Sequence, residues 1–411
     1  MAEALPLTEM QLRAQISKKW HTYPPDVLPM WLADMDFQPA AAIRSVVLEA
    51  AESAQFTYPL DAEHRGVAQT FAARMRARFG WEAGADQVAV IADLVQGLTT
   101  SVLAFSEPED GVIVFSPIYP PFMRSIRVSG RKVVDVPLLE ETDGFVIDFD
   151  LLEQQAARPD VTLMLLCNPH NPTGRVFTDI ELRRVSDIAA EHGIVVVSDE
   201  VHADLVYAPH RHTVFATVSA APTVTLQSAT KSFNIAGLRC GVMHFGSEPL
   251  HRRFLDVFPD RALGRVSGLA AAATVAAWSG GDEWLGDALE TLEANRRQVF
   301  QWVSDQHPNV RAHVPEGTYF AWLHFTRIPA GVSTAHDFLL QSARVALQAG
   351  QDFGVPYTSW ARLNFATSPR ILRKALNRMT AALPNPLTGH ARSSQPGPPD
   401  NGTPQREART S

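Results

Sequence analysis

Short, almost continuously apolar runs recur through the first half of the chain, and polar or turn-forming residues bound each of them. Such runs predict strands of a sheet that helices cover on both faces, because a half-exposed strand would alternate apolar and polar residues. An alternating run at 223–227 predicts a further strand. The continuous runs lie at 88–91, 112–115, 161–166 and 194–198.

Apolar residues also recur at the spacing of one helix face. They predict two amphipathic helices near the N-terminus, one through Ile43, Val47, Ala50 and Ala54 and one through Val67, Phe71, Met75 and Phe79. An uncharged run at 266–281 is shorter than the ~20 apolar residues of a spanning helix and predicts a buried helix. Further helices are predicted at 180–192, 285–303, 335–347 and 371–383, with strand-like stretches at 316–323 and 361–366.

The chain, at 411 residues, is too long for one small core. We expect the helix at 285–303 to carry the chain from a large domain to a smaller one. The predicted division is an N-terminal arm with the start of the small domain, the large domain, the small domain and a disordered tail rich in Pro, Gly and Ser. The boundaries are 1–45, 46–290, 291–383 and 384–411.

Composition narrows the classes of partner. A net charge of −8 and a pI near 6.0 give no basic footprint for nucleic acid or an anionic membrane, so we expect a small-molecule partner. The two cysteines, Cys167 and Cys240, support neither a disulfide framework nor a metal site. No signal peptide is apparent at the N-terminus, and we expect a cytoplasmic protein without metal.

The segment after the strand at 223–227 contains the strongest candidate for a catalytic residue, a lysine. Lys231 lies in a turn among small and apolar residues, with Ser228 three positions before it and Arg239 eight after it. Such surroundings lower the pKa of an amine and favour its attack on an aldehyde. The alternative is a surface lysine in a Ser/Thr-rich loop.

The Ser-x-x-Lys-(x)7-Arg pattern resembles the cofactor-lysine motif of fold-type I pyridoxal-phosphate (PLP) enzymes, the aspartate aminotransferase superfamily. The resemblance covers approximately residues 20–383. It implies a PLP-dependent transferase fold of the α/β class, with a seven-stranded, mostly parallel sheet in the large domain and a smaller α/β domain. It also implies a homodimer, PLP bound covalently to Lys231, and a cofactor phosphate held by Ser228 and Arg239.

Other motifs fit the same resemblance. A strand, turn and helix start at 88–98 form an anion nest, which makes Val95 and Gln96 candidate phosphate ligands. Asp93 takes the place of the family's usual glycine there, and its charge is unfavourable beside a phosphate unless the side chain turns away. Tyr119, held between Ile118 and Pro120, is expected to stack on the pyridine ring, with a core aromatic as the alternative.

Two polar residues follow apolar strands. Asn171 belongs to the string Asn-Pro-x-Asn-Pro-x-Gly at 168–174, and in the family this asparagine donates to the phenolic oxygen of the cofactor. Asp199 ends a predicted strand, where open α/β sheets place function. It matches the family's aspartate that pairs with the pyridinium nitrogen and so makes the ring an electron sink.

The substrate arginine is Arg362, in Arg-x-Asn-Phe. A guanidinium in an apolar strand suits bidentate capture of an α-carboxylate, with an internal ion pair as the rival.

Three features resemble the cystathionine β-lyase (C–S lyase) branch. The stretch 31–37, Trp-Leu-Ala-Asp-Met-Asp-Phe, matches the signature of that branch, with a packed N-terminal arm as the alternative. His202, in Asp-Glu-x-His, occupies the place of a cofactor-contacting tyrosine, although a lone histidine is more often structural. Tyr58 matches a tyrosine that reaches the partner subunit's cofactor phosphate, and a structural turn tyrosine is the alternative.

These motifs together predict β-elimination on cystathionine or a related cysteine S-conjugate, giving pyruvate, ammonia and a thiol. A class I/II aminotransferase is the first alternative, and a regulatory binding protein on the same scaffold is the second. The intact Lys231, Asp199 and Arg362 weigh against the regulatory reading. The expected partners are an amino-acid substrate and a second copy of the chain.

Overall fold

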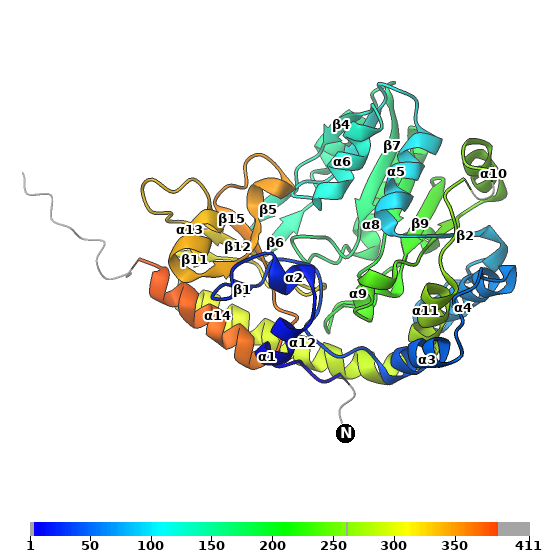
Figure 1. Cartoon of the computed structure of the whole chain (residues 1–411). Helices are drawn as coiled ribbons and strands as arrows, with labels where there is room; N and C mark the ends of the chain where they lie inside the picture. Colours follow the sequence, from blue (N-terminus) through cyan, green and yellow to red (C-terminus); the bar gives the residue numbers. More distant parts are fainter. Residues whose placement is uncertain (1–3, 260–261, 385–411) are drawn as a thin grey trace, which may run out of the picture.

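The structure is a computed structural model that describes residues 4–259 and 262–384. The predicted tail at 384–411 therefore lies, after Pro384, outside the described residues. Two α/β units share one long helix, α12 (Asp282–Asp305), which runs beneath both of them in Figure 1. The expected boundary at 290/291 falls inside this helix.

The large domain is built on a seven-stranded sheet that is parallel except for β10. Five of the seven strands begin and end within two residues of the predicted runs, whereas β10 and β4 were not predicted. Across the sheet the strands are β2 (Val88–Ile91), β10 (Gly241–Phe245), β9 (Thr223–Gln227), β8 (Val195–Asp199), β7 (Val161–Cys167), β3 (Gly111–Val114) and β4 (Lys132–Asp135).

Both faces of this sheet are buried, which explains the unbroken apolar runs. Leu163 and Leu165 of β7 pack with helices α5, α6 and α10, whereas Met164 and Leu166 point to the opposite face, toward α7 and α8. These helices are α5 (Leu94–Phe105), α6 (Pro120–Val128), α7 (Phe149–Ala156), α8 (Asp179–Glu191) and α10 (Glu248–Val257). A short hairpin joins β5 (Leu139–Glu141) and β6 (Gly144–Val146).

Three further helices pack beside β2 and β10 at the edge of the large domain. The apolar run at 266–281 forms one of them, and it is buried as predicted. Ala54, expected on the first amphipathic helix, lies beyond the end of that helix in a left-handed turn. The three are α3 (Ala41–Glu52), α4 (Asp61–Phe79) and α11 (Gly268–Gly280).

The small domain combines a four-stranded sheet with α14 (Pro369–Ala382) and the second half of α12. In order the strands are β11 (Val310–Arg311), β12 (Phe320–Phe325), β15 (Trp360–Asn364) and β14 (Gln348–Ala349). The N-terminal arm, with α1 (Glu9–Ala14) and α2 (Lys18–His21), joins this domain because β1 (Leu28–Pro29) pairs with β13 (Val345–Ala346).

The helix expected at 335–347 is wrong in its second half. α13 (Ala335–Phe338) continues as a single π-helical segment to Ala343, and Arg344 then adopts a left-handed conformation with φ 54°. The chain turns there because Val345 and Ala346 pair with β1. No helix among residues 4–259 and 262–384 is long and apolar enough to cross a membrane.

Candidate active site

A cavity lies at the carboxyl end of the large sheet, beside the N-terminal arm. It collects residues that are far apart in the sequence. Of the predicted site residues, it is lined by Val95, Tyr119, Asn171, Asp199, His202, Lys231 and Arg239.

Lys231 projects into this cavity from the one-turn helix α9 (Ala229–Ser232). Its Nζ donates a hydrogen bond to the backbone carbonyl of Ala33 at 2.9 Å. Burial lowers the pKa of the amine, and the charge of Arg362 acts in the same direction, while Asp34 and Asp199 oppose it. A neutral amine is the form that attacks an aldehyde, so the surroundings favour covalent chemistry at Nζ.

Asp199 ends β8 at the floor of the cavity and is 6% exposed. It accepts one hydrogen bond, from the Val201 backbone N–H at 3.1 Å, and forms no ion pair with a described side chain. Burial raises the pKa of its carboxyl to about 7. A buried carboxylate with so little compensation is suited to a cationic N–H donor, such as a protonated ring nitrogen.

Arg362 lies in the middle of β15, and its guanidinium reaches toward the cavity wall. It donates to Asn171 Oδ1 at 2.8 Å and to the Trp31 carbonyl at 3.2 Å, and it lies 4.0 Å from the centre of the Phe320 ring. Among the described residues its Nε has no hydrogen-bond partner, and no carboxylate forms an ion pair with the guanidinium. Because the buried charge lacks a counter-ion, a substrate carboxylate is the partner that it fits.

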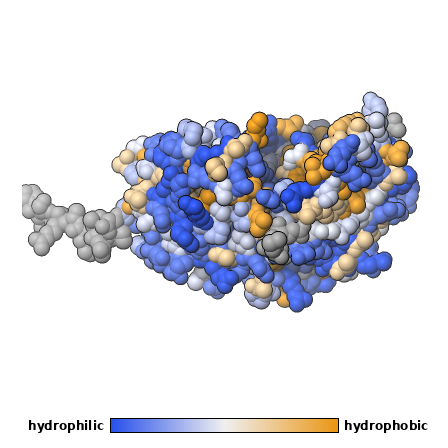
Figure 2. Space-filling view, turned by 60° about the horizontal axis from the view of Figure 1, so that its bottom comes forward, coloured by the Kyte–Doolittle hydropathy of each residue, from blue (hydrophilic) through white to orange (hydrophobic). Residues whose placement is uncertain are grey.

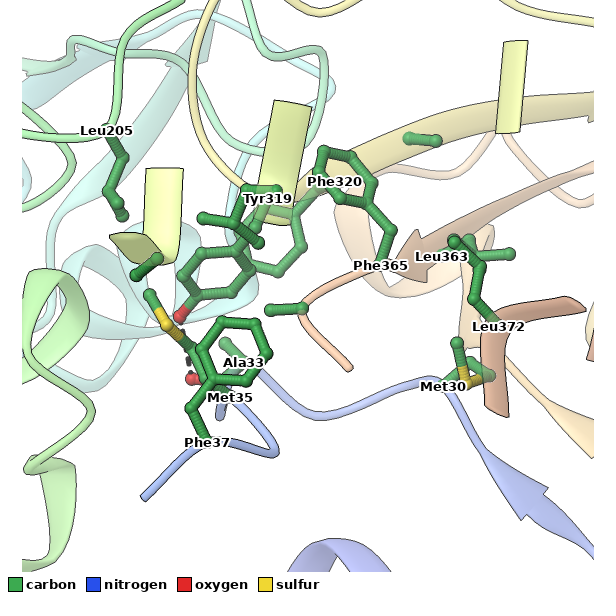
Figure 3. Packing of buried hydrophobic residues seen from close by; sticks show 14 of the residues in the cluster. Met30, Ala33, Met35, Phe37, Leu205, Tyr319, Phe320, Leu363, Phe365 and Leu372 are labelled. Carbon is green, nitrogen blue, oxygen red and sulfur yellow. Dashed lines mark hydrogen bonds between the residues drawn. The ribbon is translucent and has the colours of Figure 1, made fainter. Parts of the chain in front are cut away.

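A strap at residues 31–37 forms one wall of the site. The Ala33 carbonyl accepts from both Lys231 and the Tyr319 hydroxyl, the second at 3.0 Å, and Figure 3 shows Tyr319 pointing at Ala33. The amides of Asn234 and Asn364 bond to backbone groups of the strap from the large and the small domain. The signature stretch is therefore part of the site.

Buried polar contacts hold the strap from behind. Lys19 pairs with Asp36 at 3.0 Å and donates to the Asp34 carbonyl, while Trp20 donates to Asp36 at 2.8 Å. Both side chains of the pair are 2% exposed. The acid at position 36 is thus structural, and it fixes the loop that carries Ala33.

His202 lies edge-on to the rings of Tyr319 and Phe320, with 5.6 Å between ring centres in each case. Burial lowers the pKa of its imidazole well below the ordinary value, and Lys231 and Arg362 reinforce the shift. The ring is therefore neutral, and its Nδ1 is buried without a hydrogen-bond partner in the part of the chain that the structure describes. His202 also lines the cavity, and its predicted contact with the cofactor stays a prediction.

The end of the cavity near α5 contains Arg239, Thr230 and the first turn of that helix. Asp93 caps α5, accepting from the Gln96 N–H at 2.8 Å, and it forms an ion pair with Arg239. The backbone N–H of Gln96, expected as a phosphate donor, is thus engaged by Asp93. The Gln96 side chain turns away toward Ala92 and Leu263.

Ser228 bonds to the backbone around the lysine turn. Its hydroxyl donates to the Cys240 carbonyl at 2.6 Å and accepts from the Thr230 N–H, so it braces the lysine turn. Of these two hydroxyl residues, Thr230 lines the cavity and Ser228 does not, so the predicted contact of Ser228 with the phosphate stays a prediction.

Tyr58 lies outside the cavity of its own chain. It is 97% exposed, between α3 and α4.

Tyr319 contacts the site and was not predicted as a site residue. It is a tyrosine in the strand-like stretch at 316–323, but nothing in the sequence indicated that its hydroxyl bonds to the Ala33 carbonyl.

Other polar residues near Asp199 have structural roles. Glu200 accepts from the Phe215 backbone N–H and pairs with His212 at 2.9 Å, and Asp204 pairs with Arg74 at 3.0 Å.

The donor set fits PLP. Lys231 offers an amine for the aldehyde, Asp199 a buried acceptor for the ring nitrogen, and Arg239 with the start of α5 a cationic end for the phosphate. Tyr119 and Val201 line the same cavity. Among the described residues, no three His, Cys, Asp or Glu side chains gather in a way that would hold a metal ion.

Comparison with known proteins gives a consistent result. PatB of Bacillus subtilis (strain 168), named a cystathionine β-lyase, is 34% identical over 361 residues, which cover 87% of this chain and 93% of that protein. The solved structure of OvoB matches with a TM-score of 0.86 at 32% identity, covering 93% of this chain and 99% of that one. A putative PLP-dependent β-cystathionase from Corynebacterium diphtheriae also matches with a TM-score of 0.86, at 29% identity and 92% and 98% coverage.

The family comparison agrees with this fold and with the order of the motifs. The family model for aminotransferase class I and II matches residues 34–379, from the strap through most of α14. The chain belongs to the class I and II aminotransferase family.

Proposed function

We propose that this protein is a PLP-dependent carbon–sulfur lyase that performs β-elimination on cystathionine or related cysteine S-conjugates. The observation that carries the proposal is one cavity that combines Lys231 and Asp199, in a chain 34% identical to a protein named cystathionine β-lyase. That relative matches this chain over most of its length. The cationic Arg362 donates to Asn171, which lines the same cavity.

Each residue has a definite task in this reaction. PLP, when bound, supplies an electron-withdrawing ring that stabilises negative charge at the substrate Cα. Arg362 holds the α-carboxylate, Asp199 keeps the ring nitrogen protonated, and the Lys231 amine removes the Cα proton. The C–S bond then breaks with its electron pair on sulfur, giving a thiol after protonation. Water converts the remaining three-carbon fragment to pyruvate and ammonia.

The test is pyruvate formation from L-cystathionine by the purified protein with PLP and without any keto acid. We expect continuous turnover, and Lys231→Ala should lower the rate by at least about 10³-fold because the amine bonds to the cofactor and moves the proton. Absence of pyruvate from the wild-type protein would refute the proposal.

The family description itself favours aminotransferase activity as the second candidate. In that case the proton that Lys231 takes from Cα returns to the cofactor instead, and amino groups pass to a keto acid. The same assay separates the two, because a transaminase stops after one equivalent of substrate until a keto acid is added.

We also propose a homodimer in which Tyr58 reaches the partner's site. The supporting observation is exposed apolar surface on the large domain: Phe56 and Leu60, which flank Tyr58, are 71% and 70% exposed. A nearby groove is lined by Ile43, Val47, Leu48, Ile235 and Leu238. On the face in Figure 2, hydrophobic residues gather mainly on one half.

Mixing two inactive variants tests this arrangement. If Tyr58 crosses the interface, a heterodimer of Lys231→Ala and Tyr58→Phe subunits contains one intact site, and activity returns on mixing. A chain that sediments as a monomer, or variants that never complement, would contradict the proposal.

We further propose that the protein is located in the cytoplasm and that it takes part in methionine biosynthesis. Both cysteines, Cys167 and Cys240, are buried and unpaired, as in proteins of reducing compartments.

A further inference from the structure

The end of the cavity near α5 contains an acid among groups that suit an anion. Asp93 and Arg239 both line the cavity, and an ion pair joins Asp93 Oδ2 to Arg239 Nη2. The other carboxylate oxygen, Oδ1, accepts from the Gln96 N–H at 2.8 Å. One carboxylate therefore engages both a guanidinium and the first turn of α5.

Arg239 and the first turn of α5 are also the groups that would bind a phosphate ester. α5 is twelve residues long, so its N-terminus provides unpaired N–H groups and the positive end of a helix dipole. Arg239 supplies a full positive charge, and its backbone is held in a left-handed conformation with φ 56°. A phosphate and the Asp93 carboxylate carry charge of the same sign and seek the same donors.

Both side chains reach water. The Asp93 side chain is 30% exposed and that of Arg239 63%. The ion pair is therefore not buried, and Asp93 or Arg239 can exchange its partner for water or for an anion.

We propose that Asp93 acts as an internal competitor for the cofactor phosphate, so that this chain binds PLP more weakly than its donor set alone would allow. The inference rests on the proposed PLP-dependent function. Its consequence is a cofactor that exchanges with free PLP, because each phosphate contact with Arg239 or α5 displaces or shares a contact with Asp93.

The test is Asp93→Asn, which keeps an oxygen for the Gln96 N–H and removes the charge. The dissociation constants of PLP, of inorganic phosphate and of pyridoxal, which lacks the phosphate, are measured by tryptophan fluorescence titration. We expect PLP and inorganic phosphate to bind at least about tenfold more tightly to the variant, because the like charge is removed. Pyridoxal should bind equally well to both proteins.

Asp148→Asn is the matched control. Asp148 caps α7 in the same way, accepting from the Leu151 N–H at 2.9 Å, and it does not line the cavity. This variant should bind PLP like the wild type. Thermal unfolding of both variants checks that each is folded.

Unchanged or weaker phosphate binding by Asp93→Asn would overturn the inference, since Asp93 would then serve to position Arg239. An equal gain in Asp148→Asn would overturn it as well. If the wild-type protein and Asp93→Asn both failed to bind PLP, the proposed function itself would fall. A wild-type protein that binds PLP beside an Asp93→Asn variant with no gain would refute only the role of Asp93.

Discussion

The Ala33 carbonyl shows how single residues form this site. It accepts hydrogen bonds from Lys231 and Tyr319, which belong to different domains. Motifs that resemble those of the family placed Lys231, Asp199, Asn171 and Arg239 at one site, and all four line one cavity. The contact between Tyr319 and Ala33 was not predicted, because it depends on a backbone carbonyl that only the tertiary fold brings near.

Asp199 leads to a prediction about pH. In the cofactor-free protein its pKa rises from 3.8 to about 7 through burial. Between these pH values the folded chain keeps a proton that the unfolded chain releases. The free energy of unfolding should therefore fall as pH rises through this window, by up to about 4 kcal/mol.

Urea unfolding at pH 5 and pH 8 covers the upper part of this window and should show a loss of up to about 3 kcal/mol. Asp199→Asn, which cannot ionise, should lose the dependence, and bound PLP should reduce it because a paired carboxylate ionises more readily. Equal pH dependence in wild type and variant would show that the buried carboxyl is not responsible.

Arg362 leads to a prediction about substrate binding. Arg362→Lys keeps the charge but loses the forked geometry, so we expect KM for the amino-acid substrate to rise about 10- to 100-fold with a smaller change in kcat. Arg311→Lys, at an exposed position of the same small sheet, is the control and should leave both constants unchanged. A loss in kcat alone would point to a role in the chemical step.

At the scale of elements, the hydrophobic pattern predicted five of the seven strands of the large sheet and helices α8, α12 and α14, each within a few residues. A strand buried on both faces is continuously apolar, and a helix buried on one face repeats its apolar residues every three to four positions. Strands β4 and β10 were not predicted. The stretch at 335–347 failed because the pairing of β13 with β1 overrides its helical pattern. That pairing partner lies more than 300 residues away in sequence, so local propensity carries no sign of it.

The strap gives a prediction at this scale. Lys19→Met would leave Asp36 buried without its counter-ion, which should lower the free energy of unfolding by about 3–5 kcal/mol. Lys132→Met breaks the exposed pair with Glu109 and should cost at most about 1 kcal/mol. Chemical denaturation of both variants compares the two costs, and similar small values would show that the buried pair does not stabilise the strap.

At the scale of the molecule, the two domains share one apolar core. The largest buried cluster includes residues of α4 and α11 in the large domain and of β12, β15 and α14 in the small one. α12 passes through it, and its buried Asn295 donates to the carbonyls of Phe365 and Thr367. The sequence analysis expected a boundary at 290/291, which falls inside α12, and the apolar pattern does not indicate that the core continues across it.

This shared core predicts that the domains unfold together. Asn295→Ala removes the side-chain donor to the Thr367 carbonyl, while the Phe365 carbonyl keeps the Thr367 N–H as a donor. We expect a cost of about 1–3 kcal/mol, with tryptophan fluorescence and far-ultraviolet circular dichroism giving the same lowered midpoint. Asn377→Ala, on the exposed face of α14, should leave the midpoint unchanged. Separate midpoints for the two signals would show that the domains are independent.

The pairing of β1 with β13 has a practical consequence for exchanging substrate range between relatives. The wall opposite the large sheet is assembled from two distant stretches of chain, the arm with its strap and the region from Tyr319 to Arg362. A chimaera that grafts only the C-terminal third would join a foreign strand to the native arm. Donor segments should therefore be transplanted as a matched pair, with the sheet of the large domain kept as the recipient.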